Sequence, residues 1–182
     1  MVWVGKKQVA NGQPALNVQP DGSVSWEQPD SKGLAGSEGF CGQTAVANML
    51  CMTEKTRAVT PHRVSRAAGD ITPGCKPHTL LRAIRQLSPR PQRYAIYNNP
   101  LLQSVSRASP VICLLHWQGT TFHYVTVVKT TRTAVTFNHW GLQDTLERST
   151  FERRWKFQGR GVAAGAVAAL GQLRPTTSIR CR

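Results

Sequence analysis

Hydrophobic positions in the first half of the chain recur at intervals of three and four residues, which is the spacing of one helix face. Three segments show this pattern, namely residues 41–52, 60–69 and 76–87. In the second segment Thr60 is a suitable N-cap, Pro61 suits the first helical position and Gly69 suits the residue that ends the helix. The pattern therefore predicts three helices in this half.

After Ser109 the spacing becomes that of β-strands. Residues 110–117 are a continuous apolar run, as in a buried strand, and residues 122–130 and 132–138 alternate and are rich in Val and Thr. The short polar stretch between the last two predicts a hairpin centred on residues 130–131. Weaker helical patterns occur at residues 98–108, 149–155 and 161–173.

Helices first and strands later predict an α+β fold, in which N-terminal helices pack on a C-terminal antiparallel sheet. Residues 1–38 are rich in Gly, Pro, Ser, Asn and Asp. We expect them to form an N-terminal arm and loop with one or two short strands. Residues 39–182 then form a single domain, since 182 residues can bury one hydrophobic core.

The formal net charge of +14 favours an acidic partner. The basic residues are scattered and no aromatic-interleaved nucleic-acid motif accompanies them, so nucleic acid is not expected as the substrate. No apolar run approaches the ~20 residues that span a bilayer, and the N-terminus lacks the features of a Sec signal. We expect action in a cytoplasm, without a membrane partner, after delivery by a specialised secretion system or in the producing cell.

The chain has five cysteines, which are Cys41, Cys51, Cys75, Cys113 and Cys181. Their number is odd and their spacings are long, with no CxxC and no paired Cys/His ligand spacing. We therefore expect neither a disulfide framework nor a metal site, and no cofactor. Cys51 and Cys113 lie in apolar stretches and are expected to be buried packing residues.

Cys41 stands apart from the other cysteines because of its neighbours. In "GFCGQTAVANML", residues 39–50, it follows Gly39 and precedes Gly42 at the start of a predicted helix. Backbone N–H groups at a helix N-terminus stabilise negative charge, which favours the thiolate form. The flanking glycines leave room for a substrate backbone. Cys41 is therefore the candidate nucleophile.

A nucleophilic thiol needs a base, and His123 is the best placed of the five histidines. His62 and His78 each follow a proline at a predicted helix start, where surface or capping roles suffice, and His116 is expected to be structural. In the predicted hairpin, His123 lies nearly opposite Asn138, so the amide could hold the imidazole.

The order Cys, His, Asn resembles that of the papain-like cysteine peptidases. "GFCGQTAVANML" and "FHYVTVV" resemble the nucleophile helix and histidine strand of double-glycine leader peptidases, and "FNHWG" resembles the Asn-Ser-Trp-Gly segment of plant-type members. The resemblance implies that Asn138 orients His123 and that Trp140 shields their contact from water. It also implies an oxyanion hole of the Cys41 backbone N–H and a glutamine, for which Gln28 is the nearest upstream candidate.

The leading hypothesis is a papain-like cysteine peptidase that cleaves a protein after small residues such as Gly-Gly. The same resemblance implies a bacterial toxin or effector domain, restrained by an acidic immunity or inhibitor protein. A deamidase or acyl-transfer enzyme with the same triad is an alternative, because motifs do not separate these reactions. A basic module that binds nucleic acid or an acidic protein without catalysis is another. Asp144 is a rival to Asn138, but the predicted register places it beyond reach of His123.

Overall fold

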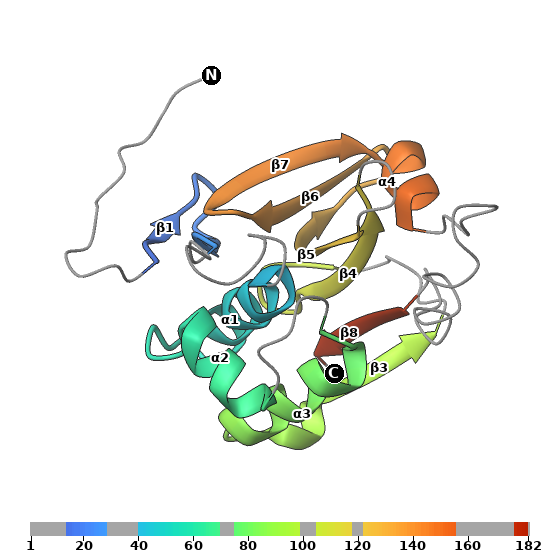
Figure 1. Ribbon diagram of the computed structural model, residues 1–182. Coiled ribbons are helices and arrows are strands. Elements are labelled where there is room, and N and C mark those ends of the chain that lie inside the picture. The colour runs from blue at the N-terminus through green and yellow to red at the C-terminus, as the bar shows by residue number, and fades with distance from the viewer. Residues whose placement is uncertain are drawn as a thin grey trace.

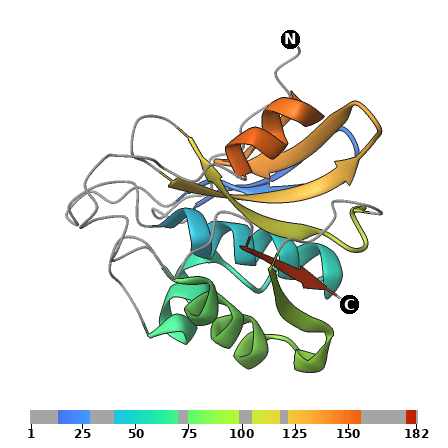
Figure 2. The same ribbon diagram turned by 90° about the vertical axis from the view of Figure 1, so that its right-hand side faces the viewer.

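A six-stranded sheet lies between two layers of helices in the computed structural model, which describes residues 14–28, 40–69, 75–98, 105–117, 122–155 and 177–181. Helices α1 and α3 cover one face of the sheet, with α2 packed against both of them, and α4 covers the other face (Figures 1 and 2). The helices are α1 (Cys41–Thr53), α2 (Pro61–Ala68), α3 (Pro77–Leu87), the 3-10 turn η2 (Pro91–Arg93) and α4 (Arg148–Trp155).

The three N-terminal helices form where the sequence predicts them. In α2 the Thr60 side chain accepts a hydrogen bond from the Arg63 N–H, Pro61 is the first residue, and Gly69 ends the helix at a φ of 63°. Such a left-handed φ is easily adopted only by glycine. None of the described helices is long and apolar enough to cross a membrane.

The sheet is antiparallel throughout, with the strand order β3-β8-β4-β5-β6-β7. Its strands are β3 (Tyr94–Asn98), β4 (Val111–His116), β5 (Phe122–Thr130), β6 (Ala134–His139), β7 (Leu142–Glu147) and β8 (Thr177–Cys181). The predicted α+β class, with early helices packed on a later antiparallel sheet, is confirmed. The sequence patterns did not identify β3, β7 and β8.

Two predicted helices differ from the structure or lie beyond its description. The helix expected at residues 98–108 is wrong where it can be checked, because Asn98 ends β3 and Ser106 forms a bridge with Ser109 across a tight turn. Asn99 to Ser104 lie outside the described residues, as does the closing helix expected at residues 161–173.

The β5–β6 hairpin has a different register from the predicted one. Thr130 pairs with Val135 and Thr126 with Asn138, so the expected pairing of His123 with Asn138 is wrong. The turn begins later, because the Thr131 hydroxyl and backbone N–H hold Ala134 across it. An irregularity between residues 127 and 129 shifts the register once more.

Each face of the sheet carries its own core. Helix α1 is almost wholly buried, and its Met49 and Leu50 pack with residues of α3 on the first face. On the second face Phe151 and Trp155 of α4 pack against Phe137 and neighbouring strand residues. Because α1 is held on all sides, its first residue has a well-defined position at one end of the sheet.

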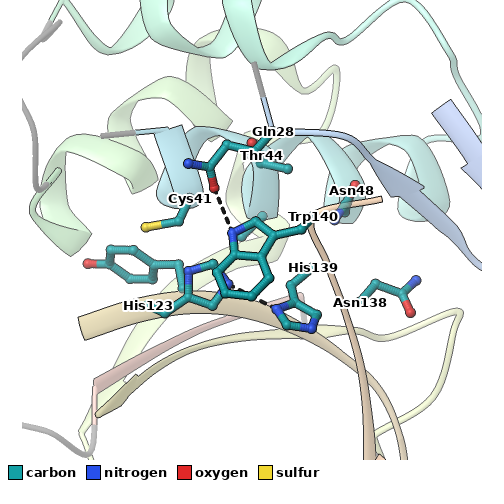
Figure 3. Close-up of a pocket in the computed structure, with 10 residues that line it drawn as sticks. Gln28, Cys41, Thr44, Asn48, His123, Asn138, His139 and Trp140 are labelled. Atoms are coloured by element: carbon teal, nitrogen blue, oxygen red, sulfur yellow. Dashed lines mark hydrogen bonds between the residues drawn. The ribbon is translucent and has the colours of Figure 1, made fainter. Parts of the chain in front are cut away.

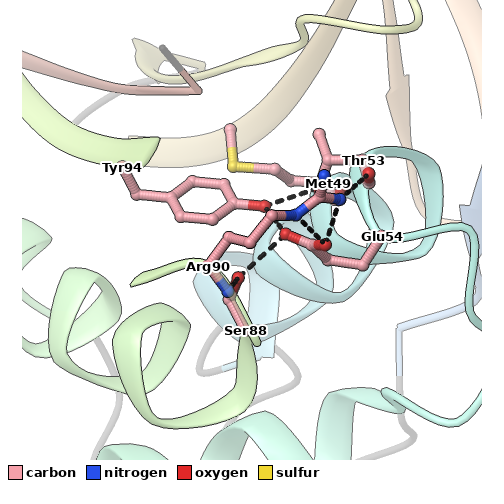
Figure 4. A network of polar contacts seen from close by, with 6 residues as sticks. All are labelled: Met49, Thr53, Glu54, Ser88, Arg90 and Tyr94. Carbon is pink, nitrogen blue, oxygen red and sulfur yellow. Dashed lines mark hydrogen bonds and ion pairs between the residues drawn. The ribbon is translucent and has the colours of Figure 1, made fainter. Parts of the chain in front are cut away.

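A polar network anchors the C-terminal end of α1 to β3 (Figure 4). The Glu54 carboxylate accepts hydrogen bonds from Ser88 at 2.8 Å, Tyr94 at 2.7 Å and Arg90 at 2.6 Å. Burial alone would raise the pKa of Glu54, but the bonds from Arg90, Tyr94 and Ser88 outweigh it and lower the pKa. The ionised carboxylate therefore ties the helix to the sheet.

The described part of the N-terminal segment forms two short strands, β1 (Leu16–Val18) and β2 (Val24–Trp26), as predicted. This hairpin belongs to the body of the protein. The backbone N–H of Trp26 donates to the Asn48 side chain at 2.7 Å, and its indole packs in the core beside α1. The hairpin thus brings the residues that follow β2 close to the start of α1.

Candidate active site

A small pocket lies between the N-terminal half of α1 and the adjoining ends of β5 and β6 (Figure 3). Cys41 is 8% exposed and His123 is 6% exposed, so the pocket is nearly closed. It is lined by Gln28, Cys41, Thr44, Ala45, Asn48, His123, Tyr124, Asn138, His139 and Trp140. The fold therefore brings all five residues that sequence reasoning singled out into one place.

Cys41 is the first residue of α1, as predicted. Phe40, which precedes it, packs edge-to-face on His62 of α2 with ring centroids 5.7 Å apart. A side chain at Gly42 would place its Cβ 3.0 Å from Leu80 and 3.2 Å from Tyr124. A larger residue at position 42 would press on these two side chains, so glycine favours the close approach of the start of α1 to α3 and β5.

A chain of hydrogen bonds runs from His123 to a carboxylate through a second histidine. The Nε2 atom of His123 lies 3.2 Å from Nδ1 of His139, and Nε2 of His139 lies 2.7 Å from Oδ2 of Asp144. His139 is buried, whereas the Asp144 side chain is 55% exposed. These three residues form what we call the histidine relay.

The relay assigns the proton on each ring. An ionised carboxylate can only accept, so Asp144 requires the proton of His139 to be on Nε2. The Nδ1 atom of His139 then accepts from Nε2–H of His123. With both rings neutral, Nδ1 of His123 keeps its lone pair, and Figure 3 shows His123 lying between His139 and Cys41.

Burial is the main electrostatic influence on these histidines. Burial and the nearby His139 lower the pKa of His123 to about 3. Burial also lowers the pKa of His139, against the hydrogen bond and charge of Asp144, which act to raise it. Both rings are therefore neutral at pH 7, which agrees with the proton positions given above.

Trp140 covers the pair of histidines. Its ring centroid lies 4.4 Å from that of His123 and 4.4 Å from that of His139, at interplanar angles of 36° and 30°. Trp117 meets all three rings from another side, at centroid distances of 5.1–5.3 Å. The indole of Trp140 thus lies over the His123–His139 hydrogen bond, as a shield against water would.

Asn138 has a different environment from the one expected. Its amide donates to Ser23 Oγ at 2.8 Å and to the Val24 carbonyl at 2.9 Å, and its oxygen accepts from Gln143 at 3.0 Å. The predicted contact with His123 is therefore wrong, because the later turn moves Asn138 opposite Thr126. Asn138 joins the β1–β2 hairpin to the sheet.

Sequence reasoning did not consider His139 as a functional residue, although it directly follows Asn138. Continuing the observed register by one step places His139 opposite Val125, diagonal to His123 on the neighbouring strand. Diagonal neighbours are within reach of long or aromatic side chains. The correct position of the β5–β6 turn would have placed His139 beside His123 and so identified it. Asp144 misses His123, as expected, but it binds the histidine that His123 contacts.

Gln28 follows β2 and lines the same pocket as Cys41, despite its separation in sequence. Its side-chain oxygen accepts a hydrogen bond of 3.0 Å from the Trp140 indole N–H. In Figure 3 the amide nitrogen of Gln28 lies on the side of Cys41. The hairpin therefore brings back the glutamine that the resemblance required.

Among the described side chains, several other histidines and cysteines have environments that fit packing or surface roles. His116 packs edge-to-face on Phe122, and His78 is exposed on α3. Cys51 and Cys113 are buried, as predicted. Within the described ranges, no group of three or more His, Cys, Asp or Glu side chains is arranged to hold a metal ion.

Chemically, the arrangement offers a thiol at a helix N-terminus, a neutral imidazole with an oriented lone pair, and an amide donor beside the thiol. Comparison of the chain with protein-family models and with curated proteins gives no match.

Proposed function

We propose that this protein is a cysteine peptidase in which Cys41 is the nucleophile, His123 the general acid and base, and His139 with Asp144 the orienting pair. The observation that carries the proposal is that one pocket holds Cys41 and His123, and that His123 is hydrogen-bonded to His139, which in turn is hydrogen-bonded to the Asp144 carboxylate. A nucleophile, its base and an orienting group within one site is the arrangement of covalent acyl-transfer catalysis.

In the first step Nδ1 of His123 takes the proton of the Cys41 thiol, and the sulfur attacks the carbonyl carbon of the substrate. A C–S bond forms, and the carbonyl oxygen becomes an oxyanion. The Cys41 backbone N–H, at the first position of α1, and the Gln28 amide nitrogen stabilise that charge.

When the intermediate collapses, the C–N bond breaks and His123 gives its proton to the departing amine. The product is a thioester on Cys41. His123 then takes a proton from water as the water oxygen attacks the thioester carbon, the C–S bond breaks, and the proton returns to sulfur. The free acid leaves, and the thiol and the neutral imidazole are restored.

The relay suits this role because it keeps His123 in one tautomer. As His123 becomes positively charged, the Asp144 carboxylate stabilises the charge through His139. The low pKa of His123, about 3, keeps its imidazole neutral at pH 7 with a lone pair on Nδ1, and its acceptance of a proton depends on the negative charge that Asp144 supplies through His139. The thiol is then deprotonated during attack and is not held as a preformed ion pair.

The resemblance to papain-like peptidases supports this proposal and is refined by it. A cysteine at the start of a buried helix, a histidine on an antiparallel sheet and a tryptophan over the histidine agree with that family's pattern. The third residue departs from it, since His139 occupies the place that we expected for Asn138. We propose the papain-like fold, a toxin or effector role inside a target cell, and cleavage after small residues on the same resemblance.

The charge distribution supports an acidic protein inhibitor as a partner. The described residues between positions 55 and 98 include no Asp or Glu. This region, which we call the basic layer, contains α2 and α3 and exposes Lys55, Arg57, Arg63, Arg66, Lys76, Arg82, Arg85 and Arg90. Complementary charge of this kind speeds association and makes it dependent on salt.

The test is expression of the wild type and Cys41→Ala in bacteria, followed by proteome-wide identification of new protein N-termini. Cys113→Ala is the matched control, because Cys113 is buried in the core of the opposite sheet face. The proposal expects new N-termini with the wild type and the control but not with Cys41→Ala. Modified proteins that gain about one dalton without new N-termini would instead show a deamidase. Identical proteomes for all three would refute catalysis by Cys41.

A further inference from the structure

We infer that Trp140 is a positioning residue for the oxyanion hole, because its indole N–H selects the orientation of the Gln28 amide that can stabilise an oxyanion. The inference rests on the proposed function, in which Gln28 is an oxyanion donor. This role is distinct from shielding His123 and His139 from water, because it belongs to a single atom of the Trp140 ring, Nε1.

The Trp140 indole and the Gln28 amide differ in what they can donate and accept. An indole N–H is a donor only, so it can bind the oxygen of a glutamine amide but not the nitrogen. The observed bond of 3.0 Å from Trp140 Nε1 to Gln28 Oε1 therefore excludes the flipped amide. The Gln28 Nε2 group must then lie on the other side of the amide, and Figure 3 shows it on the side of Cys41.

The flipped amide would harm catalysis and not merely fail to help it. It would present the oxygen lone pairs of Gln28 to the developing oxyanion, while its NH₂ group faced the indole N–H. Gln28 is only half-buried, so packing alone does not select one orientation. The hydrogen bond from Trp140 favours the orientation that the structure shows.

The structure holds Trp140 in the position that this role requires. The ring is stacked on His123 and His139. The backbone of Trp140 has a φ of 48°, a value that residues other than glycine adopt only when their surroundings impose it. The next carbonyl, that of Gly141, accepts hydrogen bonds from Asn17 at 3.0 Å and Gln19 at 3.1 Å.

These two bonds tie the Trp140–Gly141 turn to the β1–β2 hairpin, which leads directly into Gln28. Donor and acceptor of the Trp140–Gln28 bond are thus carried by two segments that are fastened to each other. The same ring contacts the base and orients the oxyanion donor, so the alignment of both depends on one side chain.

The experiment compares two reactions of Cys41 in the full chain. Acylation by p-nitrophenyl acetate passes through an oxyanion, whereas alkylation by iodoacetamide does not. Trp140→Phe keeps an aromatic ring over the histidines but removes the N–H. We expect acylation to fall about 10-fold, less than the ~100–1,000-fold typical of losing an oxyanion donor outright. Alkylation should stay within about 2-fold, because it depends on the thiol and the base alone.

A double-variant cycle separates this role from a general loss of structure. Gln28→Met should lower acylation at least as much as Trp140→Phe, and the combined variant should be no slower than Gln28→Met alone. Gln86→Ala, an exposed glutamine on α3, is the control and should leave both rates unchanged. Effects of Trp140→Phe and Gln28→Met that multiply would overturn the inference, as would unchanged acylation in either variant.

Gln28→Met changes a half-buried side chain at the edge of the pocket, so it keeps the inference testable if Trp140→Phe does not fold. Reaction of groups other than Cys41 is subtracted with Cys41→Ala. If the wild type is alkylated at Cys41 but never acylated, both the proposed function and this inference are wrong. If the wild type is acylated and Trp140→Phe is acylated equally fast, only the inference fails.

Discussion

Replacing Asp144 with alanine separates the two candidates for the residue that orients His123. Asp144 ends the histidine relay, so its removal frees His139 to place its proton on Nδ1. That proton would face Nε2–H of His123, and His123 would have to change tautomer as well. Its Nδ1 would then carry a proton and could not act as the base for Cys41.

The magnitude follows from the exposure of the carboxylate. The Asp144 side chain is 55% exposed, so its hydrogen bond to His139 is screened by solvent and is worth about 1 kcal/mol. Losing it should lower the population of the productive tautomer, and with it the rate of Cys41 acylation, by roughly 5-fold. The melting temperature should change by less than about 4 °C for a chain of this size.

Asn138→Ala should show the opposite pattern. Asn138 is fully buried and makes three hydrogen bonds, whose partners on the β1–β2 hairpin and β7 would lose them. We expect a loss of about 2–4 kcal/mol of folding free energy, which lowers the melting temperature by roughly 5–15 °C. The acylation rate per folded molecule should change by less than about 3-fold, because Asn138 does not contact His123.

The assay is the burst of acylation of Cys41 by p-nitrophenyl acetate at neutral pH, normalised to the folded fraction measured by circular dichroism. Glu147→Ala is the matched control, since it removes a carboxylate from the same strand without touching the relay. If folded Asn138→Ala loses 10-fold in rate while Asp144→Ala reacts like the wild type, the relay does not orient His123. The triad would then have to include Asn138.

Three further outcomes concern stability. His123 and His139 have lowered pKa values, so the unfolded chain takes up protons near pH 6.5 while the folded chain does not. Stability should therefore fall as the pH is lowered below 6.5, by up to about 1.4 kcal/mol per pH unit for His123 down to its pKa of about 3, with a further loss from His139. Equal midpoints of urea unfolding at pH 7 and pH 5 would contradict the buried neutral pair. Glu54→Ala should cost about 2–4 kcal/mol in urea unfolding, because Ser88, Arg90 and the buried Tyr94 hydroxyl each lose a hydrogen bond to the carboxylate, although Tyr94 keeps its contact with Thr53. Glu152→Ala, which removes a more exposed carboxylate, should cost less than about 1 kcal/mol. Gly141→Ala should lower the melting temperature by several degrees, since residue 141 has a φ of 79° and the new Cβ would lie 2.7 Å from the Glu27 side chain. An unchanged melting temperature would show that this turn is not tightly packed.

Local chemistry in the sequence was enough to place Cys41, the candidate nucleophile, and the early helices. Thr60, Pro61 and Gly69 mark the bounds of α2 through interactions that span only a few residues. Cys41 begins α1 because the apolar helical pattern starts there, and the positive end of a helix is a local property. The spacing of apolar residues likewise distinguished the helical part from the strands β4, β5 and β6.

The third residue of the site could not be obtained in this way, because it depends on the register of a hairpin. A side chain of Thr131 that lengthens the turn, together with one irregularity in β5, moved Asn138 away from His123 and brought His139 to it. A shift of a few residues is invisible to periodicity, since both registers keep apolar side chains in the core.

Contacts between distant parts of the chain were decided only by the tertiary structure. β3 and β8 are a pair although about 80 residues separate them, and their short sequences carried too weak a pattern to be recognised as strands. Gln28 lines the same pocket as Cys41 because the β1–β2 hairpin is fastened to α1 and to the Trp140–Gly141 turn. The sequence by itself indicated Cys41 and His123 as the candidate thiol and base but did not indicate His139. Packing and strand register, which depend on the whole fold, determined which side chains meet.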